Sequence, residues 1–209
     1  MNGVSAADAA GETRRGGIVV RRLDAPSDAQ LQQLADVLVD CVAGGASVSF
    51  MHPLAPERAL AFWRGVAAGV ARGERVLLVA EDGDAGGGAG GDPGGNADGN
   101  SAGARICGTV QLVVDQPDNQ PHRADVSKML VHRRARRRGV GAALMQAVEA
   151  EARAAGKTLL VLDTITGSDA ARLYTRLGWQ HTGDIPDFAL MPHGGLAPTS
   201  IYWRRVPPA

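Results

Sequence analysis

The stretch that decides the fold runs from Ala124 to Ala155 and reads ADVSKMLVHRRARRRGVGAALMQAVEAEARAA. It begins with an apolar, β-prone run that predicts a largely buried strand, formed by Val126, Met129, Leu130 and Val131. Gly139 and Gly141 interrupt this run, and an amphipathic helix follows, with apolar residues at helical spacing at Leu144, Met145, Val148 and Ala152. A helix that begins directly after a glycine-containing turn presents unpaired backbone N–H groups and the positive end of its dipole. The stretch therefore predicts an anion site, for which phosphate is the usual anion.

Two common phosphate-binding motifs do not fit this turn. A Walker A loop ends in Gly-Lys-Ser or Gly-Lys-Thr, whereas Gly141 is followed by two alanines. A dinucleotide-binding fingerprint needs a third glycine where Leu144 stands, and a chain of alternating strands and helices around it. The turn is therefore expected to bind the phosphates of a different cofactor.

The segment RRRGVGA, residues 136–142, resembles the R/Q-x-x-G-x-G/A signature of the GNAT acetyltransferases. Further blocks, LLVLDTITGSDAARLYTRLGW at 159–179, GDIPDF at 183–188 and PTSIYW at 198–203, make the chain similar to the GNAT subgroup that contains the tabtoxin-resistance acetyltransferase. The resemblance implies that acetyl-coenzyme A is the cosubstrate and that the turn amides hold its pyrophosphate. The residues that it assigns to cofactor binding are Met129, Leu130, Val131, Arg136, Arg137, Arg138, Gly139, Val140, Gly141, Ala142, Ser168 and Tyr174.

The order of predicted elements extends the resemblance back to Ile18. The sequence predicts first a strand at 18–23, a helix from Ser27 or Asp28 to about Gly44, and a second helix that Pro53 and Pro56 help to start and that ends near Gly73. Strands at 75–80 and 106–114 precede the central strand and helix. A strand at 157–163, a helix from Ser168 or Asp169 through Leu177, and strands at 179–182 and 201–206 follow. The central unit is expected to be a right-handed parallel crossover. We therefore predict an α/β fold of the GNAT type, in which a mixed, mostly antiparallel sheet has helices on both faces.

Length and composition predict a single domain, residues 17–209, after a disordered segment at 1–16. Residues 82–104 consist mostly of Gly, Asp, Asn and Ala, so a flexible insertion is expected there. The 22 basic and 22 acidic residues balance, which argues against a global field for nucleic acid or a membrane. No signal peptide and no run of about 18 apolar residues is found. Cys41 and Cys107 are expected to be buried thiols, and the location is expected to be cytoplasmic.

Transfer of an acetyl group to an amine needs a base, a donor for the developing oxyanion and an acid for the leaving thiolate. The resemblance implies that Asp125 and Asp163 bind and deprotonate the amine, and that Tyr174 hydrogen-bonds the coenzyme A sulfur. Asp125 replaces a longer glutamate of the subgroup, so a water bridging it to the amine is an alternative. Ordinary structural roles also fit: a loop acid for Asp125, a turn cap for Asp163 and a packing residue for Tyr174. The oxyanion donor is expected to be a main-chain N–H near Leu130.

The same residues also bear on other functions. The arginines between 133 and 138 form a run one turn long without interleaved aromatic residues, which favours a cofactor phosphate over nucleic acid. The five histidines have no metal-ligand spacing, so no metal is expected. Cys107 has no histidine at a readable spacing, which favours direct attack over an acetyl-enzyme. A small-molecule amine, for example an amino-acid-like toxin or antibiotic, is the expected acceptor. Protein amino groups, a non-catalytic acetyl-CoA-binding protein, and a monomer or a homodimer all stay open.

Overall fold

The computed structural model describes residues 13–15, 17–83 and 104–207. Most of the two segments predicted to be disordered or flexible, 1–16 and 82–104, lies outside these residues. The prediction of disorder is wrong for Thr13–Arg15, which forms β1 and pairs with β2.

A single eight-stranded sheet has the order β1-β2-β3-β4-β5-β6-β8-β7. Neighbouring strands are antiparallel except for β5 and β6, which are parallel and joined through helix α3. This confirms the predicted mixed sheet with one parallel crossover. The remaining strands are β2 (Ile18–Arg22), β3 (Arg75–Asp82), β4 (Arg105–Val113), β5 (Arg123–Val131), β6 (Leu159–Ile165), β7 (Gln180–Leu190) and β8 (Leu196–Arg205).

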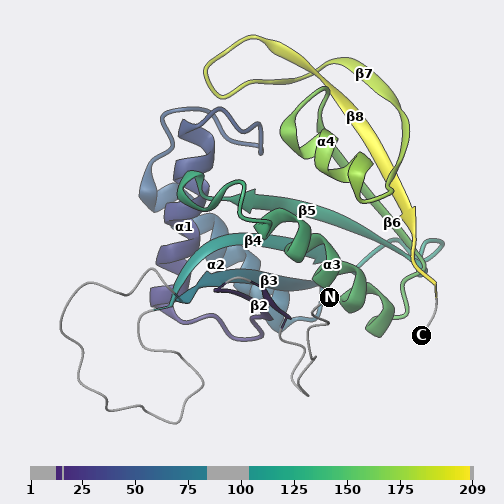
Figure 1. Ribbon diagram of the computed structural model, residues 1–209, viewed down its shortest axis with the longest axis horizontal. Helices are drawn as coiled ribbons and strands as arrows, with labels where there is room; N and C mark the ends of the chain where they lie inside the picture. The colour runs from purple at the N-terminus through teal and green to yellow at the C-terminus, as the bar shows by residue number, and fades with distance from the viewer. Residues whose placement is uncertain (1–12, 16, 84–103, 208–209) are drawn as a thin grey trace, which may run out of the picture.

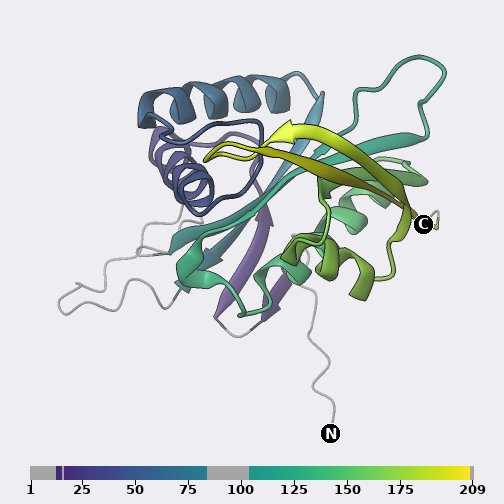
Figure 2. The ribbon, with the colours of Figure 1, turned by 90° about the horizontal axis from the view of Figure 1, so that it is seen from above.

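Helices cover both faces of the sheet, as predicted (Figures 1 and 2). Helices α1 (Asp28–Ala43) and α2 (Pro56–Ala71) pack on one face, and their core includes Leu34, Leu38 and Trp63. Helices α3 (Val140–Ala154) and α4 (Asp169–Arg176) belong to a second core on the opposite face. The start of α1 follows the sequence signal, because Ser27 and Gln30 form a reciprocal capping box. The two cores fix the sheet between the helix pairs.

The last two strands are longer than the sequence pattern indicates. The predicted strands at 179–182 and 201–206 are Gln180–Leu190 and Leu196–Arg205 in the structure. Strand β7 is an exposed edge strand with register shifts after His181 and Ile185, and such an edge tolerates Pro186. The tip of this hairpin reaches the connection between α1 and α2, where His52 N–H donates to the carbonyl of Pro192. The hairpin tip and the α1–α2 connection therefore lie side by side (Figure 2).

Candidate active site

The parallel strands β5 and β6 separate in the middle of the sheet. Their paired residues run only from Arg123 and Leu159 to Asp125 and Val161, although β5 continues to Val131 and β6 to Ile165 (Figure 1). Beyond this point, the edge of β5 that faces β6 has no partner strand within the described sheet. Diverging parallel strands leave a ligand site beyond their carboxyl ends. Asp125 on β5 and Asp163 on β6, the two candidate carboxylates, belong to the strands that border this gap.

A β-bulge changes the direction of β5 beside the gap. Thr109 pairs with Leu130 and Gln111 with Ser127, so two residues of β5, Lys128 and Met129, stand opposite one residue of β4. Lys128 has a φ of 52°, in the left-handed region that non-glycine residues rarely adopt. The bulge changes the direction of β5, and it reverses the face to which the following side chains point: Val126 belongs to the α3–α4 core, whereas Leu130 belongs to the α1–α2 core.

The main chain of Val131 faces the gap. His132 N–H donates to the carbonyl of Cys107 on β4, and main-chain direction alternates along a strand. Hence the N–H and carbonyl groups of Val131 point away from β4. The Val131 carbonyl accordingly accepts from Cys41 Sγ at 3.5 Å and from Arg136 Nε at 3.4 Å. A main-chain donor is expected near Leu130, and the N–H of Val131, one residue later, is a group that points away from β4.

The glycine turn and α3 form the second wall of the site. Gly139 has a φ of 80°, in the left-handed region that favours glycine, and it is the N-cap of α3. The first intrahelical bond runs from Ala143 N–H to the Gly139 carbonyl, so the N–H groups of the three preceding residues have no acceptor in the helix. A Cβ at Gly141 would lie 2.9 Å from Leu173 Cδ2 of α4. The two glycines thus serve different needs, a left-handed turn and the close approach of α4.

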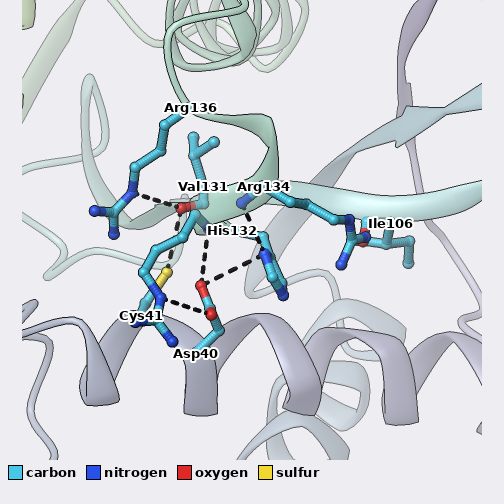
Figure 3. A network of polar contacts seen from close by, with 8 residues as sticks. Asp40, Cys41, Ile106, Val131, His132, Arg134 and Arg136 are labelled. Carbon is cyan, nitrogen blue, oxygen red and sulfur yellow. Dashed lines mark hydrogen bonds and ion pairs between the residues drawn. The ribbon is translucent and has the colours of Figure 1, made fainter. Parts of the chain in front are cut away.

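Most of the arginines in this segment are bound to the protein itself. Arg133 donates to the Asp40 carboxylate from its main chain and from Nε, each at 2.8 Å, and Arg134 donates to the carbonyl of Ile106. Arg138 forms an ion pair with the buried Asp82 of β3, with 3.1 Å between Nη2 and Oδ1. Figure 3 shows how Asp40, Val131, His132, Arg134 and Arg136 meet above α1. This network holds the turn against α1 and β4, a role that the sequence analysis did not assign to the arginines.

Asp40 carries the negative charge of this network, opposite the guanidinium of Arg133. Burial by itself raises the pKa of Asp40, but the hydrogen bonds from Arg133 outweigh it and hold that pKa below its usual range. Burial lowers the pKa of His132, more than the Asp40 carboxylate raises it. His132 is therefore neutral at pH 7, and its Nδ1 accepts from Arg134 N–H at 3.2 Å. Asp40 and Arg133 form the ion pair that fixes the turn.

The two candidate carboxylates lie on one face of the sheet, beside the gap. Leu160 and Leu162 of β6 point into the α3–α4 core, so Asp163 points to the opposite face. Asp125 lies on that same face, because its neighbours Ala124 and Val126 also belong to the α3–α4 core. Asp163 accepts from Thr199 Oγ1 at 3.3 Å, and Asp125 from Gln116 and Arg123 at 3.4 and 3.3 Å. Asp125 is thus already in an ion pair, whereas Asp163 accepts its hydrogen bond from a neutral hydroxyl and interacts with the charge of Lys128 without an ion pair.

Tyr174 and Ser168 occupy α4, on the other side of the gap. The ring of Tyr174 is 4% exposed and lies 6.0 Å from Trp179 and 5.9 Å from Tyr202, centroid to centroid. Burial, followed by the negative charge of Asp163, raises the pKa of Tyr174 far above its usual range. Ser168 caps α4 by accepting from Ala171 N–H. Tyr174 therefore keeps its proton at every working pH, and the cofactor role of Ser168 stays a prediction.

The comparisons with known proteins bear on the same segment. Residues 72–179, more than half of the chain, match the profile of the acetyltransferase (GNAT) family. The chain belongs to the GNAT family of acetyltransferases. Acetyl-CoA is the cosubstrate of GNAT enzymes. The matched residues include the gap, the glycine turn and α4.

Solved structures share the GNAT fold along nearly the whole chain. The yncA protein of Salmonella typhimurium, determined with its cofactor acetyl-CoA, has a TM-score of 0.67 and 18% identity over 92% of this chain and 95% of that one. A protein provisionally assigned as a phosphinothricin N-acetyltransferase has a TM-score of 0.67 and 18% identity over 91% and 99%. A ribosomal-protein-alanine N-acetyltransferase from Brucella melitensis has a TM-score of 0.64 and 16% identity over 89% and 98%. At these identities the likeness shows the fold alone.

One candidate residue of this GNAT enzyme was missed in the sequence. Lys128 Nζ donates to Ser49 Oγ at 3.2 Å and lies 5.8 Å from the centre of the Phe62 ring. Burial lowers the pKa of Lys128, and the negative charge of Asp163 partly offsets this effect. In the sequence, Lys128 stands out only as a lysine inside the apolar run from Val126 to Val131. Its position at a β-bulge cannot be predicted from this pattern.

A surface hollow and two buried thiols lie outside the gap. A surface hollow of about 400 Å³ lies between α4 and the β7–β8 hairpin, lined in part by Arg172, Arg176, His181 and Asp184. It is open to solvent and is not the gap between β5 and β6. Within residues 13–15, 17–83 and 104–207, no cluster of three or more metal-ligating side chains occurs, and no helix is long and apolar enough to cross a membrane. Cys41 and Cys107 are buried, as predicted, and burial raises the pKa of each thiol to about 11.

Proposed function

We propose that this GNAT enzyme transfers the acetyl group of acetyl-CoA to the amino group of a small molecule, by direct attack within a ternary complex. The observation that carries the proposal is the gap between β5 and β6. An unpaired strand edge and the N-terminus of α3 border it, and a carboxylate with a neutral partner, Asp163, lies beside it. Both thiols are buried and protonated at neutral pH, which favours direct attack over an acetyl-enzyme.

The residues present fit acetyl-CoA. Free N–H groups at Val140, Gly141 and Ala142 suit a pyrophosphate, since they combine unpaired donors with the positive end of the α3 dipole. Arg136 and Arg137 add positive charge, and their effect on the pKa of Asp169, smaller than that of Arg172, indicates that they face the start of α4. The unpaired edge of β5 around Met129 and Val131 suits the amide groups of the pantetheine arm. Bound there, acetyl-CoA would supply the activated acetyl group.

The chain itself supplies three functions around that group. An alkylammonium with a pKa near 10.4 is only about one part in a thousand neutral at pH 7, so the amine needs a proton acceptor. Asp163 takes this role, either directly or through a water shared with Asp125. The Val131 N–H donates where negative charge develops on the carbonyl oxygen. Tyr174 donates a hydrogen bond to the departing sulfur, and its raised pKa keeps it a donor.

The acceptor is an amino-acid-like small molecule in this proposal, as the resemblance to the tabtoxin-resistance subgroup implies. The likeness to a protein assigned as a phosphinothricin N-acetyltransferase supports a small acceptor, whereas the likeness to a ribosomal-protein-alanine N-acetyltransferase keeps protein amino groups as the alternative. A cytoplasmic location belongs to the same proposal. A non-catalytic acetyl-CoA-binding protein would need only the turn, and the presence of Asp163 and Tyr174 beside the gap favours an enzyme.

The test is a panel of amines assayed for release of free thiol from acetyl-CoA, with the acetylated product identified by mass spectrometry. Amino acids, aminoglycosides, polyamines and N-terminal peptides represent the acceptor classes. We expect product with at least one small molecule, and equal amounts of product and thiol. Acetylation of the peptides alone would replace the small-molecule acceptor with a protein. Binding of acetyl-CoA without any amine-dependent thiol release would favour the non-catalytic alternative.

A further inference from the structure

Lys128 forms no ion pair within residues 13–15, 17–83 and 104–207, although the negative charge of Asp163 acts on its ammonium group. Lys128 occupies the bulge of β5, and its Nζ donates to the hydroxyl of Ser49 at 3.2 Å and lies over the ring of Phe62. Both of these partners are uncharged. A partly buried ammonium is costly unless a negative charge compensates it. Asp163 compensates Lys128 only in part, because burial lowers the pKa of Lys128 more than the charge of Asp163 raises it. The position therefore suits an anionic group brought by a ligand.

Both residues of the Lys128–Ser49 hydrogen bond have unusual main-chain conformations. Lys128 has a φ of 52° and Ser49 a φ of 76°, and neither is glycine. Such conformations cost free energy and persist where the surrounding structure imposes them, often at ligand sites. Here the bulge imposes one of them, and the connection between α1 and α2 imposes the other. The pair is held in place before any ligand arrives.

Lys128 and Asp163 flank the gap on the same face of the sheet. Leu130, two residues after Lys128, belongs to the α1–α2 core, and Lys128 reaches Ser49 and Phe62 on that face. Asp163 points to the same face from β6. One strand thus carries a cation and the diverging strand an anion. A molecule with an amine at one end and an acidic group at the other is complementary to this arrangement.

We propose that Lys128 and Ser49 bind an acidic group of the acceptor, so that the substrate class is amines that also carry a carboxylate or a similar anion. The inference rests on the proposed acetyltransferase function and on Asp163 as the residue that receives the amine. The rings of Phe50 and Phe62 are in edge-to-face contact, with ring centres 5.3 Å apart, and form an apolar surface beside Lys128. Lys128 is a specificity residue in this proposal, and it takes no proton.

The test compares matched acceptors that differ only in the acidic group. The twenty common amino acids and their carboxamides are assayed with acetyl-CoA, using wild type, Lys128→Met, Lys128→Arg and Arg64→Gln. Methionine keeps the length and the Cβ of lysine, so the strain at the bulge is unchanged. Arg64 is exposed on α2, and its replacement by Gln removes the same charge away from the gap. Thermal melting verifies that each variant is folded.

We expect wild type to prefer the acid over the amide by about 10- to 100-fold in kcat/KM, as suits one charge-assisted hydrogen bond. Lys128→Met should bring this ratio close to one, whereas Lys128→Arg and Arg64→Gln should keep most of it. An unchanged ratio in Lys128→Met, or a wild type that acetylates amides and acids equally, would overturn the assignment while leaving the acetyltransferase function intact. Acetylation of peptide N-termini alone would overturn it as well.

If no acceptor of the panel is acetylated, the proposed function fails. The role of Lys128 is then tested by measuring the binding of the acceptors instead of their acetylation. The same acids and amides are titrated calorimetrically into the protein saturated with coenzyme A. Binding of acids that Lys128→Met abolishes and Arg64→Gln retains would support the anion site. Absence of any binding by wild type would overturn it.

Discussion

Asp125 and Val161 are the last residues paired between the parallel strands β5 and β6. Two residues after Val161, on the same face of the sheet, lies Asp163, where no partner on β5 remains. The two carboxylates are therefore offset along the gap: Asp125 at its closed end, and Asp163 farther along, where the strands have separated. This offset supports the proposal that Asp163 receives the amine, whereas Asp125 contacts Arg123 and Gln116.

The first prediction concerns Asp163. Asp163→Asn should raise the KM for the amine, because the neutral amide attracts the ammonium less, and it should flatten the rise of kcat/KM with pH. Asp125→Asn is the comparison, for which a smaller effect on both quantities is expected. Both variants are measured across pH on the amine that proves active. An Asp163→Asn profile identical to that of wild type would refute the assignment.

Tyr174 is predicted to act on the leaving group. Tyr174→Phe should lower kcat by about 10²- to 10⁴-fold with little change in the amine KM, the usual range for one acid or base. Tyr202→Phe is a matched control, since its ring packs directly against Tyr174. Because burial raises the pKa of Tyr174, its ionisation should add no alkaline limb to the rate profile of wild type. Full kcat in Tyr174→Phe would leave this residue a packing role only.

Acetyl-CoA binding should depend on the left-handed conformation at the start of α3. Gly139→Val together with Gly141→Leu should abolish binding in calorimetry, because side chains would distort the turn and cover its free N–H groups. Gly156 has a φ of 68° just beyond the other end of α3, so Gly156→Val imposes similar strain far from the turn. The control should lose stability but keep its affinity. Wild-type affinity in a folded double variant would remove the turn from the cofactor site.

The ion pair between Asp40 and Arg133 is predicted to stabilise the fold above acidic pH. The pKa of Asp40 is lower in the folded protein than the usual value of about 3.9, so its contribution is fully present above that value. It is lost as pH falls through the folded pKa. Asp40→Asn should reduce the free energy of unfolding at pH 7 by about 1.5–3 kcal/mol, as measured by urea titration. Asp36→Asn, at an exposed position one turn earlier in α1, should change it little; equal losses in the two variants would contradict the role of the network.

Residues 84–103 are predicted to be dispensable, because their composition offers no apolar side chain large enough to anchor them. Asp82 and Arg105 are paired at the end of the β3–β4 register, so a short turn can join the strands. Replacement of 84–103 by Asn-Gly should change the melting temperature by a few degrees at most and leave turnover unchanged. A large fall in either quantity would give the segment a structural or catalytic role.

The sequence allows much of this fold to be predicted, because most of its elements carry local signals. Ser27 caps α1, and the run from Val126 to Val131 and the glycines after it identify the central unit. The length of β7 could not be read in the same way. Its residues GDIPDF resemble a loop, and only its position at the sheet edge permits a proline within the strand.

The sequence names candidate residues for the site, but it does not predict the contacts that these residues and their neighbours make. Asp163 and the turn are candidates from the sequence because the family motifs contain them, and their roles stay predictions. The engagement of Arg138 by Asp82, and of Arg133 by Asp40, depends on residues 56 and 93 positions away. The bulge that directs Lys128 toward Ser49 arises from the β4–β5 register, which no local pattern encodes.

The most direct test of the account is the fate of a labelled acetyl group. Acetyl-labelled acetyl-CoA is incubated with the protein and the active amine, and product and free coenzyme A are quantified by mass spectrometry for wild type and Asp163→Asn. We predict label in the amide product in equal amount to the coenzyme A released, no label on the protein, and a strong loss of product with Asp163→Asn at pH 7. Label bound covalently to the protein, or product formation that Asp163→Asn leaves unchanged, would contradict direct transfer across the gap between β5 and β6.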